Sequence, residues 1–534
     1  MVSDCALPRC ATQPFHESKS NCVRHSVRDC ERVVAPANCV DATPTLPALM
    51  DDSASSNDRS NVDGILRRDF LKVAGLGAGA LLVGACASEG SERVVRGILP
   101  RKKSWGGSGA GHVVVVGAGA WGGWTALNLR RRGARVTLVD AYGAGNSRAS
   151  SGDETRGVRS SYGDRASGEL WSLWAHEAAL RWAEFEDEHA RDFGTKFFHK
   201  TGDIILRVAE EPFVTKTIEH WKTHGIAHEI MKVDDVQKRW PVFNVDDITV
   251  AVYETDAGVV RARYATQAVA AIAEREGVER VIGRVKPGKI VDGKMDGVVL
   301  DDGTVIRGDS YVFAVGPWLR KLFPEQFENR MRIPLGYVCY YGVPEGDNRF
   351  TYPNLPSWNF SGVTGWATLP VDNRGFRSRG SLARPTPAAG TAQGASGSSS
   401  TSSSSTSGST QRSNTTPVDP AQQDPDTSVR WATPERIEGS RRFIERRFPL
   451  LANAPLVETR ACHYDSSINR DFIIDNLPNT SNAWIAGAGQ AEGFKFGPVV
   501  GEYIAQRVLG EAGEAKLVEA FRMPTEEYEV APTT

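Results

Sequence analysis

Three glycines and an acidic residue occur at the spacing of a dinucleotide-binding turn. Gly117, Gly119 and Gly122 fit the pattern G-x-G-x-x-G, and Asp140 follows about 20 positions later. The first glycine permits a tight bend, the second lets the backbone approach a pyrophosphate, and the third lets helix and strand pack closely. The acid accepts hydrogen bonds from a ribose. The predicted chemistry is therefore binding of FAD or NAD.

The elements that must position this turn are predicted in the required order. The β-branched run from Val113 to Val116 is typical of a buried strand. A helix pattern follows the glycines, and a second strand from Arg135 ends at Asp140. The helix N-terminus would direct unpaired N–H groups at the phosphates. The alternative is a tight strand-to-helix turn in an α/β protein that binds no ligand.

The composition excludes several classes of protein. The chain has 534 residues, enough for two or three domains, and a formal net charge of −2. Its charged residues are interspersed, so we expect no nucleic-acid partner. We also see no spacing typical of metal ligands and expect no metal. Most of the 8 cysteines crowd the first forty residues, which argues against a disulfide framework: Cys5, Cys10, Cys22, Cys30 and Cys39.

The N-terminal region contains a pattern typical of protein export. Residues 1–66 are polar and lack periodicity, which predicts a disordered extension. Arg67 and Arg68 then precede a short, glycine-rich apolar run, so residues 67–87 resemble a signal for the twin-arginine export machinery. The run is too short to span a membrane. We therefore expect a periplasmic or otherwise extracytoplasmic protein, the alternative being a chance arginine pair.

Two further expectations concern the same region. Export signals usually start near the N-terminus, so we expect translation to begin at Met50, and recovery of peptides from residues 1–49 would refute this. The sequence around Cys86 resembles a lipobox, in which the cysteine carries a lipid anchor, and it also fits a small-residue cleavage site. Residues 88–110 are expected to form a linker to the folded body.

The remaining chain alternates predicted helices, strands and loops. A helix over Leu170–Glu186 carries aromatic residues at helical spacing, which favours a core-facing stripe over an aromatic cage. Residues 330–380 alternate apolar and polar positions, as in an antiparallel sheet. Residues 386–428 are of low complexity and are predicted to form a disordered insertion. Residues 511–534 are expected to form a C-terminal tail.

A second glycine-rich turn begins at Gly487 and leads into a predicted helix. Pro498 suits the first position of that helix. The positive end of the helix dipole would stabilise the negative charge that develops on a reduced flavin. A nicotinamide needs no such partner, so this turn favours FAD over NAD.

Taken together, the motifs resemble those of the FAD-dependent amine oxidases of the D-amino-acid-oxidase superfamily, particularly the group of monomeric sarcosine oxidase and N-methyltryptophan oxidase. The resemblance covers about residues 112–380 and 430–510. It rests on GAGAWG with Asp140, GDETRGVRSSYG, AVGPW, CHYDSSINRDFIID and GFKFGPVVGE, in that order. It implies a mixed α/β fold, in which a Rossmann-like FAD-binding domain of the glutathione-reductase type is interleaved with an antiparallel-sheet substrate domain.

The resemblance also implies a domain division and an activity. Residues 111–510 would form the oxidoreductase, with FAD-binding parts at about 111–200, 255–325 and 455–510 and substrate-domain parts at about 201–254 and 326–454. The enzyme would oxidise the C–N bond of an amino acid or N-methyl amino acid. Hydride would pass to flavin N5 and electrons then to O2, giving H2O2.

Individual residues take roles from the same resemblance. Arg159 and Lys495 match a pair that holds the substrate carboxylate, Arg156 matches an arginine close to the flavin, and Tyr162 matches a tyrosine of the substrate pocket. Cys462 matches a cysteine that forms a thioether to the flavin 8α carbon, so the FAD would be covalent. Two cations near the ring suit an anionic amino acid. The expected catalytic residues are Arg156, Arg159, Tyr162, Arg377, Glu492 and Lys495, and the expected cofactor-binding residues are Gly117, Gly119, Gly122, Asp140, Ser151, Arg156, Cys462, Gly493, Phe494 and Lys495.

Two of these positions depart from the family pattern. Arg377 lies where a lysine usually activates oxygen, and a guanidinium carries a more diffuse charge and does not give up its proton. Glu492 lies where a histidine is usual, and a carboxylate beside the substrate amine favours a cationic amine. Three alternatives to an oxidase therefore stay open: a flavin dehydrogenase with another electron acceptor, a non-catalytic flavoprotein, and an NAD-dependent oxidoreductase.

Overall fold

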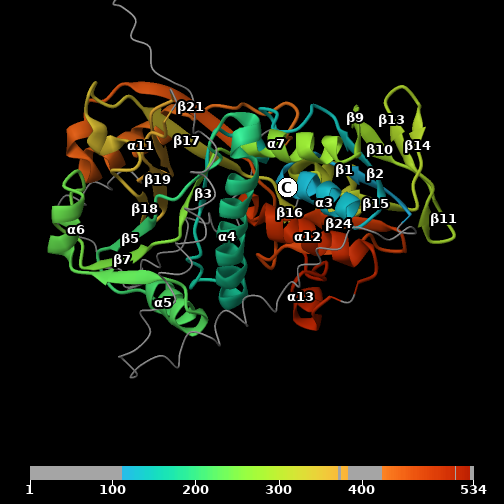
Figure 1. The fold of residues 1–534 in the computed structure, drawn as a ribbon, viewed down its shortest axis with the longest axis horizontal. Coiled ribbons are helices and arrows are strands. Elements are labelled where there is room, and N and C mark those ends of the chain that lie inside the picture. Colours follow the sequence, from blue (N-terminus) through green and yellow to red (C-terminus); the bar gives the residue numbers. More distant parts are fainter. Residues whose placement is uncertain (1–110, 371–373, 383–423, 512, 529–534) are drawn as a thin grey trace, which may run out of the picture. The chain divides into compact units, whose positions relative to one another are not determined.

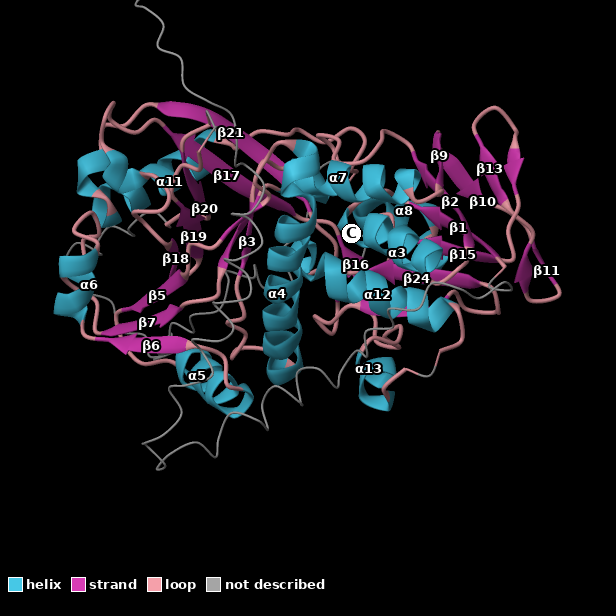
Figure 2. Cartoon of the chain, in the orientation of Figure 1, coloured by secondary structure: helices cyan, strands magenta, loops and turns pink. Residues whose placement is uncertain are grey.

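The computed structural model describes residues 111–370, 374–382, 424–511 and 513–528, which form a mixed α/β fold as predicted (Figures 1 and 2). The expected N-terminal extension, the twin-arginine segment with Cys86, the linker and most of the expected insertion lie outside these residues. Within the described ranges, no helix combines the length and apolar character needed to cross a bilayer.

The first sheet is six-stranded and contains the predicted nucleotide-binding unit. Its order is β23-β24-β15-β1-β2-β9, with parallel neighbours except for β23 and β24. The strands are β1 (His112–Val116), β2 (Arg135–Asp140), β9 (Glu279–Ile282), β15 (Ser310–Phe313), β23 (Ile473–Asn476) and β24 (Ala483–Gly487). Residues 113–116 of β1 are buried on both faces, which accounts for their unbroken β-branched run.

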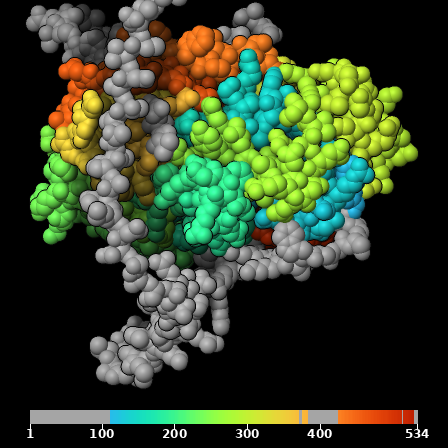
Figure 3. Space-filling view, turned by 45° about the horizontal axis from the view of Figure 1, so that its top comes forward, coloured from blue at the N-terminus to red at the C-terminus, as the bar shows by residue number. Residues whose placement is uncertain are grey.

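Helices cover one face of this sheet and a smaller sheet covers the other. Val113 and Val115 pack with α3 (Ala120–Arg131), α7 (Ala262–Arg275) and α12 (Gly497–Val508). Val114 and Val116 share a second cluster with β10 (Val285–Pro287) and β13 (Val298–Leu300), which form a three-stranded sheet with β14 (Val305–Ile306). In the space-filling view, the yellow-green segment around residues 260–300 packs directly on the cyan nucleotide-binding unit (Figure 3).

The second sheet is eight-stranded, with the order β21-β17-β20-β19-β18-β5-β7-β6. It is antiparallel except for the pair β18 and β5. The strands are β5 (Asp203–Arg207), β6 (His228–Met231), β7 (Val250–Glu254), β17 (Leu335–Tyr341), β18 (Ser357–Phe360), β19 (Val363–Trp366), β20 (Phe376–Arg379) and β21 (Leu456–His463). The sequence placed residues from 455 onward in the FAD-binding part, but β21 pairs with β17, so Cys462 reaches the site from this second sheet.

The long helix α4 (Gly168–Phe193) lies between the two large sheets (Figure 1). Its residues Trp171, Trp174, Trp182 and Phe185 are all buried in one cluster, so the prediction of a core-facing stripe is confirmed. The stripe also has a positioning role, because the Trp182 indole donates a hydrogen bond to the carbonyl of Lys495 at 2.8 Å. A core element thereby fixes the backbone of a predicted site residue.

The second glycine-rich turn differs from the prediction in where its helix starts. A 3-10 turn over Gly493–Phe496 leads directly into α12, which begins at Gly497, so Pro498 is the second helical residue and not the first. The α-helix therefore starts one residue earlier than predicted, because the 3-10 turn before it already has a helical hydrogen-bond pattern. Lys495 therefore lies inside this turn.

Two other boundaries differ from the sequence expectation. Residues 424–428 are part of the packed structure, where the buried Ser428 hydroxyl lies 2.6 Å from His463 Nε2, so the insertion does not extend through them. The expected C-terminal tail contains the helix α13 (Ala515–Ala520). Leu517 of this helix and the following Phe521 are buried against the core of the first sheet.

Candidate active site

The glycines of the first turn are required for three different reasons. Gly117 has a φ of +102°, and a Cβ there would lie 2.4 Å from the carbonyl oxygen of Ala314. A Cβ at Gly122 would lie 1.8 Å from the carbonyl oxygen of Gly117. A Cβ at Gly119 would meet only Ser151 Oγ, at 3.4 Å. The fold thus excludes side chains at the first and third positions, whereas Gly119 leaves open the space at the start of α3.

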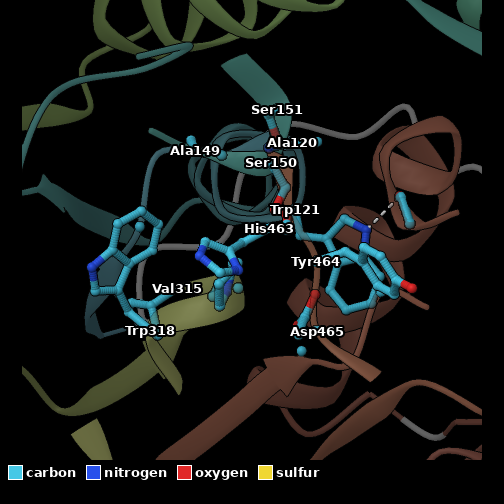
Figure 4. Close-up of a pocket in the computed structure, with 18 of the residues that line it drawn as sticks. Ala120, Trp121, Ala149, Ser150, Ser151, Val315, Trp318, His463, Tyr464 and Asp465 are labelled. Carbon is cyan, nitrogen blue, oxygen red and sulfur yellow. Dashed lines mark hydrogen bonds between the residues drawn. The ribbon is translucent and has the colours of Figure 1, made fainter. Parts of the chain in front are cut away.

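A cavity of about 620 Å³ extends from this turn across the carboxyl ends of the first sheet. Its wall includes Gly117 and Gly119, residues 140–142 at the end of β2, residues 314–318 after β15, and residues 462–465 (Figure 4). In the close-up, Trp318 lies on one side of the cavity, and Trp121 and Tyr464 lie on the other (Figure 4). The position and size are those expected for a nucleotide cofactor on an open α/β sheet.

The predicted ribose-binding acid is held by the backbone of the turn. Asp140 accepts hydrogen bonds from the N–H groups of Ala118 at 2.7 Å and of Tyr142 and Gly143, both at 2.8 Å. Burial raises the pKa of Asp140, although these three donors oppose the shift. Ser151 Oγ accepts a hydrogen bond from Ala120 N at 3.0 Å. Both predicted side chains therefore line the cavity and also fix its walls.

Cys462 and Arg156 meet at the other end of the cavity. Both line it, and Arg156 Nη2 donates a hydrogen bond to Cys462 Sγ at 3.3 Å. Cys462 is free and half-buried. Tyr464, which the sequence reasoning did not single out, also lines this end. A period-two pattern could have predicted it, because residues two apart in an extended chain, such as Cys462 and Tyr464, have side chains on the same side.

Arg377 does not line the cavity but belongs to a buried ion cluster around Asp153. Asp153 Oδ2 accepts from Arg156 Nη1 at 2.6 Å and from Arg377 Nη2 at 3.2 Å, and Arg460 lies 3.5 Å from Oδ1. Burial would raise the pKa of Asp153, but these guanidinium groups hold it well below its usual value. The Arg377 guanidinium also stacks on Trp366, 4.0 Å from the ring centroid. Its oxygen-activating role stays a prediction.

The other four predicted catalytic residues come together in one cluster. Lys495 Nζ lies 2.5 Å from Tyr162 Oη and 2.7 Å from Glu492 Oε2. Glu492 Oε1 lies 3.8 Å from Arg159 Nη2. Ala491 and Gly493, on either side of Glu492, line the cavity, as does Phe494, so the cluster adjoins the cavity wall. Arg159 and Tyr162 lie just beyond the short strand β3 (Arg156–Val158), whereas Lys495 comes from the 3-10 turn.

The electrostatics of this cluster keep Glu492 ionised. Burial alone would raise the pKa of Glu492, but Lys495 and Arg159 hold it well below its usual value. Burial lowers the pKa of Lys495 to about 8, against the opposing effect of Glu492. Lys495 is therefore mostly protonated at neutral pH, and the ion pair between Lys495 and Glu492 is intact there.

Asp426, which lies within the range 386–428 that the sequence predicted to be a disordered insertion, joins several residues at the opposite end of the cavity wall. Asp426 accepts hydrogen bonds from Lys321 Nζ at 2.6 Å, Tyr142 Oη at 2.7 Å, Trp318 Nε1 at 2.9 Å and Arg284 Nη1 at 3.1 Å. All four donors line the cavity. The sequence predicted Asp426 to belong to the disordered insertion, and its role was not predictable because its partners come from distant segments.

We expect Asp426→Asn to weaken FAD binding about tenfold, because hydrogen bonds to an ionised acceptor contribute ~1.5–3 kcal/mol and four wall residues lose theirs together. The dissociation constant should be measured by flavin fluorescence in a Cys462→Ser background, so that a covalent link cannot hide the effect. The exposed Asp302→Asn on the β13–β14 hairpin is the control. An unchanged constant would show that Asp426 does not hold this wall.

Comparisons with known proteins agree with this geometry. The family described as FAD dependent oxidoreductase matches residues 112–507. Monomeric sarcosine oxidase from Bacillus sp. (strain B-0618) is 28% identical over 74% of this chain and 92% of its own, and N-methyl-L-tryptophan oxidase from Citrobacter koseri is 24% identical over 75% and 95%. The structure of a fructosyl peptide oxidase superposes with a TM-score of 0.61, at 19% identity, over 78% of this chain and 94% of that one.

A Rossmann-like sheet with a dinucleotide cavity and a second, antiparallel sheet define a flavin-dependent oxidoreductase. The chain belongs to the FAD dependent oxidoreductase family, so the family and the FAD cofactor predicted from the motifs are confirmed. The residues present fit that cofactor, since Gly119 leaves the start of α3 open and the wall continues to Cys462. Within the described residues, no group of three His, Cys, Asp or Glu side chains is placed to hold a metal ion.

Proposed function

We propose that the protein oxidises the C–N bond of a small amine or amino acid. The observation that carries this proposal is the cluster of Arg159, Tyr162, Glu492 and Lys495 beside the Cys462 end of the cavity. Bound FAD supplies the acceptor for hydride at its N5 atom and the route of both electrons to O2, which becomes H2O2. The relatives named sarcosine oxidase and N-methyl-L-tryptophan oxidase support the same chemistry.

The chain's own residues have positioning roles in this reaction. The cluster is buried, with side-chain exposures of 2% for Lys495, 14% for Arg159 and 20% for Glu492. Glu492 is the most exposed of the three, and its chain neighbours Ala491 and Gly493 line the cavity. Lys495 holds Glu492 and Tyr162 in place, and its backbone is fixed in turn by Trp182. Rigid polar groups of this kind orient the reacting carbon against the flavin.

The test is anaerobic mixing of the purified protein with a panel of amines and N-methyl amino acids. At least one of them should bleach the flavin absorbance, and readmitted air should restore it. The amount of carbonyl product should equal the amount of flavin reduced. If no member of the panel bleaches the flavin, the protein does not oxidise amines.

A dehydrogenase is the second candidate, because the Arg377 guanidinium is tied to Asp153 at 3.2 Å and does not line the cavity. A cation held in this way is poorly placed to promote reaction with oxygen. An oxidase should form one H2O2 per amine under air. A dehydrogenase should instead reoxidise slowly in air and rapidly with an artificial acceptor.

We further propose a covalent link between Cys462 Sγ and the flavin 8α carbon. Two observations support it: Cys462 lines the cavity, and its Sγ lies 3.3 Å from Arg156 Nη2. Forming the thioether removes one hydrogen from the thiol and one from the methyl group, and the two electrons leave through the flavin to oxygen. In the parent protein the yellow colour should stay with the acid-precipitated pellet, whereas Cys462→Ser should release it to the supernatant. Buried Cys339→Ser is the control. Release of free flavin from the parent protein would show that the covalent link does not form.

We also propose that the protein is exported through the twin-arginine machinery, on the strength of residues 67–87. Replacing both Arg67 and Arg68 with lysine should leave the protein in the cytoplasm, whereas the parent chain should appear in the periplasmic or membrane fraction on fractionation. Cys86→Ser should release it from the membrane if that cysteine carries a lipid. Cytoplasmic parent protein would contradict export.

A further inference from the structure

The pair of cations expected to grip a substrate carboxylate already holds a carboxylate of this chain. Glu492 Oε2 lies 2.7 Å from Lys495 Nζ, and Oε1 lies 3.8 Å from Arg159 Nη2. The two oxygens of one side chain thus face the two cations, as the oxygens of an amino acid would. Tyr162 Oη, 2.5 Å from the same Nζ, occupies a further hydrogen-bonding position on Lys495.

The surroundings of Arg159 are rich in other carboxyl groups. Asp203 and Glu254 both interact with it electrostatically, and both are buried. Ser357 donates to Asp203 at 2.7 Å, and the backbone N–H of Ser160 donates to Glu254 at 3.0 Å. A further carboxylate entering here would approach the ionised Glu492 in a poorly solvated place, where like charges repel strongly. Burial raises the pKa of Asp203 and raises that of Glu254 to about 7, so Glu254 adds only part of a negative charge near neutral pH.

One cation of the cavity wall, Arg379, also contributes to the charge balance of the cluster. Arg379 lines the wall, but its charge also acts on Glu492 and lowers the pKa of that carboxyl together with Lys495 and Arg159. Glu492 is therefore the carboxylate with which Arg159, Arg379 and Lys495 all interact. Because the residues on either side of Glu492 line the cavity, its negative charge lies close to a molecule that enters there.

We infer that Glu492 takes the place of a substrate carboxylate on Arg159 and Lys495, and that the site oxidises amines that carry no carboxylate next to the reacting C–N bond. This inference rests on the proposed amine oxidation and names its substrate class. An amine without a carboxylate leaves the ion cluster intact, whereas an α-amino acid must displace Glu492 from both partners.

The experiment compares matched pairs that differ only in the carboxylate: dimethylamine with N-methylglycine, and N-methylethylamine with N-methylalanine. The second-order rate of anaerobic flavin bleaching should favour each amine over its amino acid in the parent enzyme. Glu492→Gln keeps the size and removes the charge, so the ratio should move toward the amino acids by on the order of 100-fold. Glu445→Gln, on an exposed position of α11 (Pro434–Arg447), should leave the ratio unchanged.

A binding measurement gives a readout that does not depend on turnover. Acetate, which cannot be oxidised here, should perturb the flavin absorption of Glu492→Gln at concentrations at least about tenfold lower than in the parent enzyme. Faster bleaching by the amino acids in the parent enzyme, or equal acetate binding by both proteins, would overturn the inference and leave amine oxidation standing. If no amine or amino acid bleaches the parent flavin, the proposed function itself fails.

Discussion

Gly119→Val should weaken FAD binding severely while leaving the fold intact. The residue is the N-cap of α3, with φ −75° and ψ −170°, an extended conformation that any residue adopts, so the substitution introduces no backbone strain. A Cβ at this position meets only Ser151 Oγ, at 3.4 Å, and the rest of the side chain extends into the cavity that Gly119 lines. The methyl groups would then occupy the space where a pyrophosphate approaches the backbone. We expect affinity for FAD to fall on the order of 100-fold.

The measurement is the flavin content of the purified variant and its uptake of added FAD, with circular dichroism to verify the fold. Gly123→Ala is the matched control, since Gly123 lies in the first turns of α3 and its Cβ would contact Val269 Cγ1 at an ordinary 3.5 Å. Gly123 does not line the cavity. Normal flavin content in Gly119→Val would show that the cofactor does not approach this turn.

Asp153→Asn should cost the protein ~3–5 kcal/mol of folding stability. The buried carboxylate, 3% exposed, is the shared partner of Arg156, Arg377 and Arg460. Removing its charge leaves Arg156 and Arg377 close together without the carboxylate that they share, while Arg460 keeps its 3.9 Å contact with Glu458. Because Arg156 also contacts Cys462, the same change should disturb the flavin end of the cavity.

Stability should be measured by denaturant unfolding of the flavin-loaded protein, followed by both tryptophan fluorescence and flavin release. The exposed Asp302→Asn serves as the control for loss of a carboxylate charge. Replacing Arg377 with Met in the Asp153→Asn background should recover part of the loss, because one uncompensated charge is removed. A loss below about 1 kcal/mol, the typical contribution of an exposed ion pair, would show that Asp153 does not hold the cluster together.

The sequence predicted well those features that depend on local patterns. The strand, glycine turn, helix and second strand of the nucleotide-binding unit follow from residues within thirty positions of one another, and each has a steric reason that the structure shows at Gly117 and Gly122. The aromatic stripe of α4 could also be predicted from local sequence, because apolar residues at helical spacing must pack against another surface wherever the helix lies.

Features that depend on pairing between distant segments could not be predicted. β21 pairs with β17, and only the folded sheet shows that Cys462 lies opposite Gly336 in that register. Asp153 meets Arg377 across 224 positions of sequence, so nothing in its neighbourhood marks it as the centre of an ion cluster. Glu492 was recognised as unusual, but the contact of its other oxygen with Arg159 joins segments more than 300 residues apart, which no local pattern indicates.

A crystal structure of the enzyme purified with its FAD tests the central claim most directly. The account predicts phosphate density at the start of α3 beside Gly119 and isoalloxazine density against Arg156, Cys462 and Tyr464, with Glu492 still on Arg159 and Lys495. A cofactor whose adenine lies at Cys462, or a flavin outside the cavity that joins Gly119 to Tyr464, would contradict it.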